Sequence, residues 1–312
     1  MARHIELRVA EARPAGPGIR RLTLRDPDGW PLPRVRPGAH LDLHVPGVGP
    51  RAYSLCGDPS VQDAWTVAVK LEAESRGGST WVHGLREGDP VAASMPRCTF
   101  PLAKGAARHV MIAGGIGVTP FLAMAPVLER AGAGWTLHLL HRGALPCPDE
   151  LARWLASGRA VAHDTAVTPR PSLDALLGPW QPGLQAYCCG PLAMIDAFEQ
   201  ATAAWPSGTA RAEHFVPPIL APDPSARPYT LVLAGSGAAA DVAAGGSMLA
   251  ALRALGTKVE ASCEGGICGA CKMRWLEGEP IHRDRVLTPE ERQTHLMACV
   301  AGCASERLVL EA

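Results

Sequence analysis

The sequence predicts a multidomain protein of the β and α/β classes. An antiparallel β-barrel or sandwich comes first, then a parallel α/β domain, then a smaller C-terminal domain. Three observations carry this prediction. Residues 1–103 contain short runs of alternating hydrophobicity, strands and helices alternate from Arg108 onward, and residues 217–228 are rich in proline. A chain of 312 residues suits two domains of ordinary size or three small ones.

The first part of the chain is predicted to be β-structure. His4–Val9 alternates polar and apolar residues, and similar short runs are Leu41–Val45, Trp65–Lys70 and Val91–Ser94. Glycines and prolines separate these runs. This pattern is typical of a small antiparallel barrel or sandwich.

The second part changes to an alternation of strands and helices. The strand Val110–Ala113 precedes the helix Pro120–Arg130, and the strand Thr136–Leu140 follows. Later, the strand Ala186–Cys189 leads into the helix Leu192–Ala203. Such alternation predicts a parallel sheet covered by helices.

One uncharged stretch, Val110–Leu128, is long enough to raise the question of a transmembrane helix. Glycines at 114, 115 and 117 and prolines at 120 and 126 interrupt it. Because these residues break a continuous helix, we expect a strand, a turn and a helix here, and no membrane span.

The third part begins after a linker. Residues 217–228 hold five prolines, which fix φ and remove backbone donors, so this stretch is predicted to be semi-rigid. Tyr229–Leu233 is predicted to be a strand. Ser247–Leu255 is predicted to be an amphipathic helix capped by its serine and ended by Gly256. Arg307–Leu310 supplies a last strand.

Composition excludes some classes of function. Lysine plus arginine equals aspartate plus glutamate at 30 each, which argues against a nucleic-acid binder. The N-terminus lacks the basic start and apolar core of a secretory signal, so we expect a cytoplasmic protein. In a reducing compartment the ten cysteines favour metal binding or redox chemistry over disulfides.

The strongest motif is a cysteine cluster. Cys263, Cys268 and Cys271 follow the spacing C-x4-C-x2-C, and Cys299 lies downstream. This is the plant-type pattern for a [2Fe–2S] cluster, which needs four thiolates. Glycines between the cysteines allow a tight loop whose N–H groups can point at sulfur. A zinc site with four cysteine ligands is the alternative. Spacing alone leaves Cys303 open as the fourth ligand.

Two strand-to-helix junctions have the features of nucleotide-binding loops. Val110–Pro120 joins an apolar strand to a helix through a G-G-x-G turn, where backbone N–H groups can approach a phosphate. Tyr187–Pro191 is a second junction of this kind, and such junctions gather at one edge of a parallel sheet. A plain turn is the alternative for each. Cys188 and Cys189 can also be small core residues, which suits Cys188 better.

Two segments of the first part suit a phosphate and a flat ring. In Arg51–Ser54, arginine can neutralise phosphate, tyrosine can lie against a ring and serine can donate to a ring nitrogen. Gly77–Thr80 is predicted to be an exposed backbone nest with hydroxyls. Each segment alone is also compatible with an ordinary surface loop.

Together these motifs resemble the phthalate dioxygenase reductase family, the single-chain reductases of Rieske oxygenases. The resemblance covers nearly the whole chain and preserves the order of the motifs. It implies an FMN-binding β-barrel at 1–103, an NAD-binding α/β domain at 104–216, a linker at 217–228 and a β-grasp plant-type [2Fe–2S] ferredoxin domain at 229–312.

The resemblance also implies site residues. Those expected to bind the flavin are Arg51, Ala52, Tyr53, Ser54, Ala68, Val69, Lys70, Gly77, Gly78 and Ser79. Those expected at the nucleotide loops are Gly114, Gly115, Gly117, Thr119, Pro120, Cys189, Gly190 and Pro191. Ser54, Thr119 and Phe215 are expected nearest the reacting centre, Phe215 because the family's E-x-F phenylalanine matches Glu213-His214-Phe215. The motif M-x-C-V selects Cys299 over Cys303, so the expected cluster ligands are Cys263, Cys268, Cys271 and Cys299.

The implied function is an NADH-dependent reductase that uses FMN and its own [2Fe–2S] cluster to reduce a Rieske-type oxygenase component. That partner would be an aromatic dioxygenase or an O- or N-demethylating monooxygenase. FMN is favoured over FAD because the Gly78–Ser79 loop would close on a terminal phosphate. The resemblance implies NADH, although His141 and Arg142 follow the second strand with no acid before Asp149, which is compatible with NADP.

Two alternatives stay open. One is a self-sufficient NADH oxidase or flavin/ferric reductase without a dedicated partner. The other is a cysteine-rich metal-binding module attached to an inactive fold. Outside these motifs, His282-Arg283-Asp284 is predicted to be a solvated turn rather than a partner contact.

Overall fold

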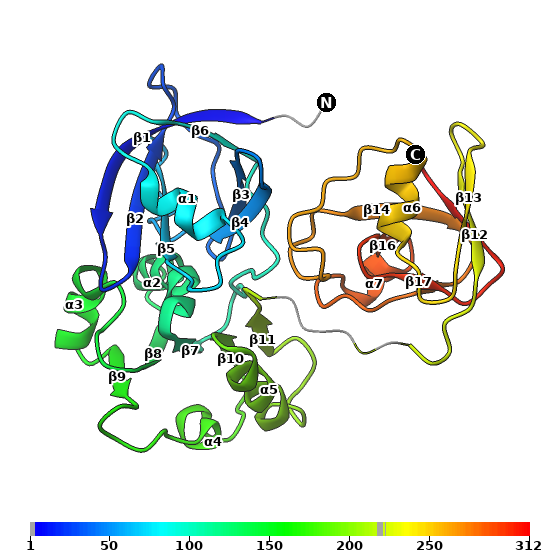
Figure 1. The fold of residues 1–312 in the computed structure, drawn as a ribbon. Coiled ribbons are helices and arrows are strands. Elements are labelled where there is room, and N and C mark those ends of the chain that lie inside the picture. The colour runs from blue at the N-terminus through cyan, green and yellow to red at the C-terminus, as the bar shows by residue number, and fades with distance from the viewer. Residues whose placement is uncertain (1–3, 217–220, 222) are drawn as a thin grey trace. The chain divides into compact units, whose positions relative to one another are not determined.

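The computed structural model describes residues 4–216, 221 and 223–312. It divides into two compact units, Met1–Phe215 and Val216–Ala312 (Figure 1). Within the first unit an antiparallel β-sheet and a parallel α/β layer are both present.

The antiparallel sheet of the first unit has six strands in the order β4-β3-β6-β1-β2-β5. Its strands are β1 (Ile5–Pro14), β2 (Ile19–Arg25), β3 (His40–Val45), β4 (Gly49–Ser54), β5 (Trp65–Lys70) and β6 (Pro90–Ala93). Side chains alternate between the two faces of a strand, and Leu22, Leu24 and Val67 lie on the inner face, where they are fully buried. Leu55, just past β4, bridges to Val67 on β5, so the two edge strands meet and the sheet closes.

The parallel sheet of the first unit has the order β11-β10-β7-β8-β9. Its strands are β7 (Arg108–Gly114), β8 (Gly134–His141), β9 (Ala160–Asp164), β10 (Leu184–Cys189) and β11 (Ala210–Glu213). The chain moves outward from β7 through β8 to β9 and then returns to the other side of β7 to form β10. The order of the strands therefore reverses between β7 and β10.

Helices cover both faces of the parallel sheet. They are the 3-10 turn η1 (Gly115–Val118) and the helices α2 (Thr119–Arg130), α3 (Pro148–Ala156), α4 (Leu173–Leu177) and α5 (Leu192–Ala201). One face packs Met111 against Phe121 of α2 and Leu151 of α3. The other packs Ile112 against Phe198 of α5. The stretch Val110–Leu128 is thus strand, turn and helix, as predicted.

No helix among the described residues is long and apolar enough to cross a membrane.

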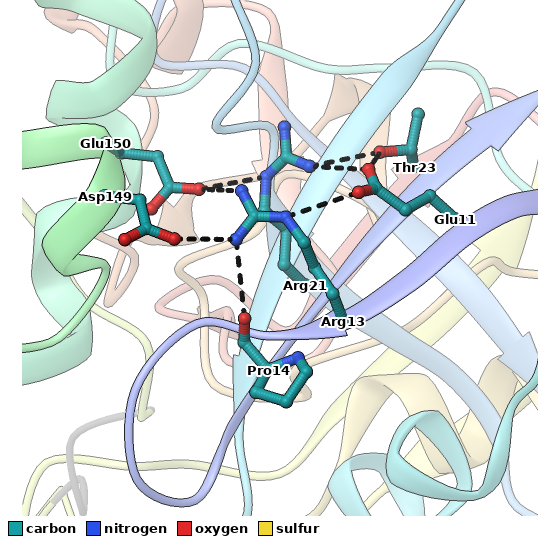
Figure 2. A network of polar contacts seen from close by, with 7 residues as sticks. All are labelled: Glu11, Arg13, Pro14, Arg21, Thr23, Asp149 and Glu150. Atoms are coloured by element: carbon teal, nitrogen blue, oxygen red, sulfur yellow. Dashed lines mark hydrogen bonds and ion pairs between the residues drawn. The ribbon is translucent and has the colours of Figure 1, made fainter.

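A charged network joins the antiparallel sheet to α3 (Figure 2). Glu150 accepts from Arg13 of β1 at 2.7 Å and pairs with Arg21 of β2 at 3.2 Å. Asp149 pairs with Arg13 at 3.3 Å, and Glu11 lies within 3.4 Å of both arginines. Glu150 is the most buried acid of the three, with 18 % of its side chain exposed. The network therefore fixes α3 against the barrel.

The second unit is a mixed sheet with a helix packed on it (Figure 1). Its elements are β12 (Tyr229–Leu233), β13 (Ala239–Val242), α6 (Met248–Ala254), β14 (Lys272–Glu277), β15 (Pro280–Ile281), α7 (Pro289–Arg292), β16 (His295–Met297), β17 (Gly302–Cys303) and β18 (Arg307–Leu310). The main sheet has the order β13-β12-β18-β14-β16, with β12 and β18 parallel. Leu252 of α6 packs on Leu231 and Leu308 in the core.

Candidate functional site

The first part of the site lies where β4 meets helix α1 (Gly78–Gly84). A Cβ atom added at Gly78 would lie 2.7 Å from the Tyr53 hydroxyl oxygen and 2.8 Å from Arg51 Cγ. Only glycine allows the loop to come this close to β4. The structure therefore brings together Arg51, Tyr53 and Gly78, which are far apart in the sequence.

The guanidinium of Arg51 is only partly used by the protein. It donates to the carbonyl oxygens of Pro50 at 2.8 Å and Arg76 at 3.3 Å. Its Nε is buried, and the described residues offer that atom no hydrogen-bond partner. An arginine held in place with an unpaired N–H suits an anionic group such as a phosphate. This N–H, beside the closely packed Gly78, fits a phosphate group.

The Gly77–Thr80 segment corrects our prediction of an exposed nest. Gly77 adopts φ +91°, which turns the chain so that α1 begins at Gly78. Gly78 and Ser79 are buried as a result. Ser79 Oγ donates to Ser75 Oγ at 2.9 Å and accepts from the backbone N–H of Glu72 at 3.2 Å. Sequence reasoning missed both partners because no pattern marks the loop 71–76.

The other residues expected at the flavin divide into two groups. Ala68 and Val69 are buried in β5, and the Val69 carbonyl lies 2.9 Å from Nε2 of His83 on α1. Ala52 is exposed on β4. Lys70 is also exposed, and its ammonium group pairs with Glu72 at 3.6 Å.

The second part of the site is the crevice at the reversal of the strand order. Ligands of open α/β sheets bind there, outside the carboxyl ends of the strands. A Cβ at Gly114 would lie 2.6 Å from Pro191 Cδ, and one at Gly190 would lie 3.1 Å from Gly114 Cα. A Cβ at Gly117 would collide with the carbonyl of Cys189. The two predicted nucleotide loops are therefore in direct contact, and glycine makes that contact possible.

The remaining residues of the first loop have different surroundings. Gly115 adopts φ +54° with open space where a Cβ would point. Thr119 is buried, and its hydroxyl donates to the Ile116 carbonyl at 3.0 Å, which stabilises the turn into α2. Pro120 lies in the first turn of α2 and is buried.

A buried carboxyl group joins the two parts of the site. Ser54 at the end of β4 donates to Glu213 Oε2 at 3.3 Å, and the Cys189 thiol lies 3.9 Å from the same oxygen. Burial raises the pKa of Glu213 from 4.5 to about 8, against the opposing effect of hydrogen bonds from Ser54 and Cys189. At pH 7 this carboxyl group is therefore mostly neutral. Sequence reasoning noted Glu213 only as part of the E-x-F match.

Two residues expected near the nucleotide, Cys189 and Phe215, differ in exposure. Cys189 is as fully buried as Cys188, so the core interpretation suits both, contrary to our prediction. It faces inward because β10 is covered on both faces. Burial raises the pKa of the Cys189 thiol well above its ordinary value, so it stays protonated. Phe215 lies two residues beyond Glu213 and is 40 % exposed.

The four expected cluster ligands form two pairs in the second unit. The thiols of Cys263 and Cys268 are hydrogen-bonded to each other, and so are those of Cys271 and Cys299. The charge of a Cys268 thiolate also contributes to raising the pKa of Cys299. A [2Fe–2S] cluster takes two thiolates on each iron, so a pairwise arrangement fits it. In the described residues, no group of three or more His, Cys, Asp or Glu side chains is gathered for one metal ion.

Backbone donors point at these sulfurs. The N–H of Gly265 lies 3.4 Å from Cys263 Sγ. The hydrogen bond with Cys268 and the neighbouring N–H groups lower the pKa of Cys263 to about 6, although burial opposes this. Such donors stabilise thiolate charge. The donor set therefore fits an iron–sulfur cluster.

The Cys303 thiol is hydrogen-bonded to Ser305, outside the cysteine loop. Cys303 lies in β17, and its thiol is 3.2 Å from both the carbonyl oxygen and the hydroxyl of Ser305.

The segment His282-Arg283-Asp284 corrects another prediction, because it is not a solvated turn. The side chain of Asp284 is only 1 % exposed. Its Cα would lie 3.0 Å from a Cβ at Gly266, so the turn packs directly on the cysteine loop. This packing joins segments 18 positions apart, which no local pattern reveals.

Comparison with known proteins agrees with this geometry. A family model described as a 2Fe-2S iron-sulfur cluster binding domain matches residues 231–303. The phthalate dioxygenase reductase of Burkholderia cepacia is 37 % identical, over 98 % of this chain and 97 % of that protein. The chain belongs to the phthalate dioxygenase reductase family.

Solved structures extend the comparison. One of phthalate dioxygenase reductase, described as a modular structure for electron transfer from pyridine nucleotides to [2Fe–2S], is 35 % identical and has a TM-score of 0.71, covering 99 % of this chain and 98 % of that one. An intact type IV self-sufficient cytochrome P450 monooxygenase is 37 % identical with a TM-score of 0.92, covering 99 % of this chain and 41 % of that one.

Membership of the family confirms the resemblance and the predicted fold class. The protein has an antiparallel six-stranded sheet, a parallel α/β sheet and a C-terminal ferredoxin domain. It is an oxidoreductase, a reductase with flavin and [2Fe–2S] domains.

Proposed function

We propose that this reductase oxidises NADH and delivers the electrons one at a time, through FMN and its own [2Fe–2S] cluster, to a Rieske-type oxygenase component. The observation that carries the proposal is the contact of Ser54, Glu213 and Cys189, because it joins the barrel site to the nucleotide crevice. When bound, the flavin supplies the conversion between two-electron and one-electron transfer. The cofactors carry this chemistry, so the chain's residues bind, orient and exclude water.

The flavin is proposed to bind across β4, β5 and the Gly77–Ser79 loop. Arg51 would neutralise the phosphate with its unpaired Nε–H. Tyr53 would lie along the ring system, and Ser54 would hold the reactive end beside Glu213. FMN is favoured over FAD because a loop whose Gly78 packs this closely on Tyr53 would close on a terminal phosphate.

The nicotinamide nucleotide is proposed to bind over the Gly114–Gly117 turn and the Cys189–Pro191 turn, with Phe215 near the reacting rings. Asp164, at the end of β9, supports NADH over NADPH. Its carboxylate accepts from the backbone N–H of Gly143 at 2.9 Å, beside the loop that follows β8. That hydrogen bond and one from Ala166 lower the pKa of Asp164. A 2′-phosphate at this edge would meet a negative charge.

We also propose domain boundaries after residues 103 and 216, a linker over 217–228 and a ferredoxin domain over 229–312. The gap between β6 and β7 and the end of β11 at Glu213 support the first two boundaries. A cytoplasmic location is part of the proposal. All ten cysteines are free, which suits a reducing compartment.

The experiment is an anaerobic titration with NADH, followed by visible absorbance, on wild type and Cys271→Ala. In wild type the flavin and the cluster should bleach in turn. The variant should keep ferricyanide reduction by the flavin and lose reduction of cytochrome c and of the oxygenase. If reduction of the oxygenase survives in the variant, the cluster is not on the path. A clear preference in kcat/KM for NADPH would overturn the choice of nucleotide.

A second candidate acceptor is a haem monooxygenase, because the P450 protein named above contains a region similar to this whole chain. Adding a haem domain and a Rieske component separately to the reduced enzyme distinguishes them. The physiological acceptor should be reduced faster by wild type than by Cys271→Ala. Reduction of dioxygen at the same rate with and without either acceptor would instead favour a self-sufficient oxidase.

A further inference from the structure

The carboxylate of Asp284 is the most deeply buried acid in the described part of the second unit. Its Oδ2 accepts from the backbone N–H of Leu287 at 2.9 Å and of Val286 at 3.3 Å. Arg292 lies 3.6 Å from the same oxygen and donates to the Asp284 carbonyl at 2.8 Å. These contacts fold residues 284–287 into a turn around the carboxylate.

That turn holds one peptide of the cysteine loop. The backbone N–H of Arg285 donates to the Gly266 carbonyl at 3.0 Å. Gly266 adopts φ +71°, and an added Cβ would lie 3.0 Å from Asp284 Cα and 2.8 Å from Val300 Cγ2. Gly266 is therefore held between the Asp284 turn and Val300, which restricts the rotation of both peptides that flank it.

The preceding peptide, Gly265–Gly266, faces a cluster ligand. The backbone N–H of Gly266 acts as a donor toward the sulfur of Cys299, where it opposes the rise in the thiol's pKa that Cys271 and burial cause. An N–H donor to a ligand sulfur stabilises the more negative, reduced cluster and so raises its reduction potential. A short chain of contacts therefore runs from the Asp284 carboxylate through Arg285 and Gly266 to Cys299.

We propose that Asp284 is a positioning residue of the iron–sulfur centre: it shapes the turn that aims the Gly266 N–H at Cys299, and so raises the potential at which the cluster accepts an electron. The inference rests on the cluster assignment and is independent of the flavin, nucleotide and partner proposed above. Asp284 acts here as a hydrogen-bond acceptor within the fold. Its charge alone would have the opposite effect, because a nearby negative charge disfavours reduction.

These opposite signs define the experiment. The cluster midpoint potential is measured by redox titration with EPR detection in wild type, Asp284→Ala, Asp284→Asn and Glu290→Gln. Glu290, an exposed acid of α7, is the matched control for losing one charge from the same segment. Deuterium-sensitive Fe–S stretching bands in resonance Raman spectra report N–H···S bonds directly.

The alanine variant should shift to lower potential and lose part of the deuterium sensitivity. The asparagine variant keeps an oxygen that accepts from Leu287, so it should keep the deuterium sensitivity and a potential at or above that of wild type. An alanine variant that shifts upward, as charge loss requires, would overturn the proposal.

If the alanine variant does not hold a cluster, the asparagine variant decides. Loss of its deuterium sensitivity would refute the positioning role, and retention supports it. A wild-type protein without a cluster EPR signal would refute the cluster assignment itself, which is a different outcome.

Discussion

Replacement of Glu213 by glutamine should remove the contribution of this residue to the pH dependence of the first unit's stability. Burial gives the folded state a pKa of about 8 at Glu213, against 4.5 for an unburied glutamate. Between these values the folded chain binds a proton that the unfolded chain has released. Stability from this group is therefore complete below pH 4.5, declines as pH rises, and is lost by pH 8.

The magnitude follows from the size of the shift. One pKa unit corresponds to about 1.4 kcal/mol, so wild type should lose about 3 to 4 kcal/mol between pH 5 and pH 8 through Glu213 alone. Glutamine has a similar shape and does not titrate. We therefore expect Glu213→Gln to match wild type near pH 5 and to exceed it by about 3 to 4 kcal/mol at pH 8.

The assay is urea denaturation followed by tryptophan fluorescence at several pH values, with both proteins saturated with FMN. Glu87→Gln is the control, because it removes an exposed carboxyl group from the same unit and should keep the wild-type pH slope. If Glu213→Gln shows the same slope as wild type, Glu213 is already ionised at neutral pH and the burial argument fails.

Three further predictions concern the network and the glycines. Glu150→Gln should lower the free energy of unfolding by about 1 to 3 kcal/mol, because this acid contacts both arginines and is mostly buried. Asp149→Asn should cost less than about 1 kcal/mol, because the Asp149 side chain is 78 % exposed. Equal losses of the two variants in thermal denaturation would contradict these roles. Gly78→Ala should weaken FMN binding by at least about tenfold in a fluorescence titration, equivalent to about 1.4 kcal/mol. Gly84→Ala should leave the affinity unchanged, because a Cβ at Gly84 meets open space. Similar affinities in both variants would refute a role of the Gly78 contact in flavin binding. Gly117→Ala should raise the KM for NADH by at least about tenfold without changing the affinity for FMN, because the added Cβ would collide with the Cys189 carbonyl. An unchanged KM would exclude this loop from the nucleotide site.

Local patterns predicted much of the fold. Trp65–Lys70, Tyr229–Leu233 and Arg307–Leu310 form strands with the predicted bounds, because each is an apolar or alternating run between polar or turn-forming residues. Ser247 caps α6 by accepting from the N–H of Ala250, and Gly256 follows the helix with φ +78°. These features depend on neighbours within one turn or strand.

Features that depend on distant residues could not be predicted. Helix α1 begins at Gly78 without a side-chain cap, so nothing in its sequence marked the start. Asp284 is buried by a loop that precedes it by 18 positions. Glu213 has a raised pKa because tertiary packing buries it, and its hydrogen-bond partner Ser54 lies 159 positions earlier in the chain. In each case a tertiary contact determines the environment, and the printed sequence does not show which residues will meet.

The strand order of the second unit also has a consequence for biogenesis. β18 lies in the middle of its sheet, between β12 and β14, although it follows both of these strands in the sequence. Leu308 and Leu310 are fully buried there. During translation the cysteine loop therefore leaves the ribosome before the sheet that supports it can close. Iron delivered at that stage would meet a nascent chain without a finished scaffold, so cluster insertion should follow the synthesis of β18.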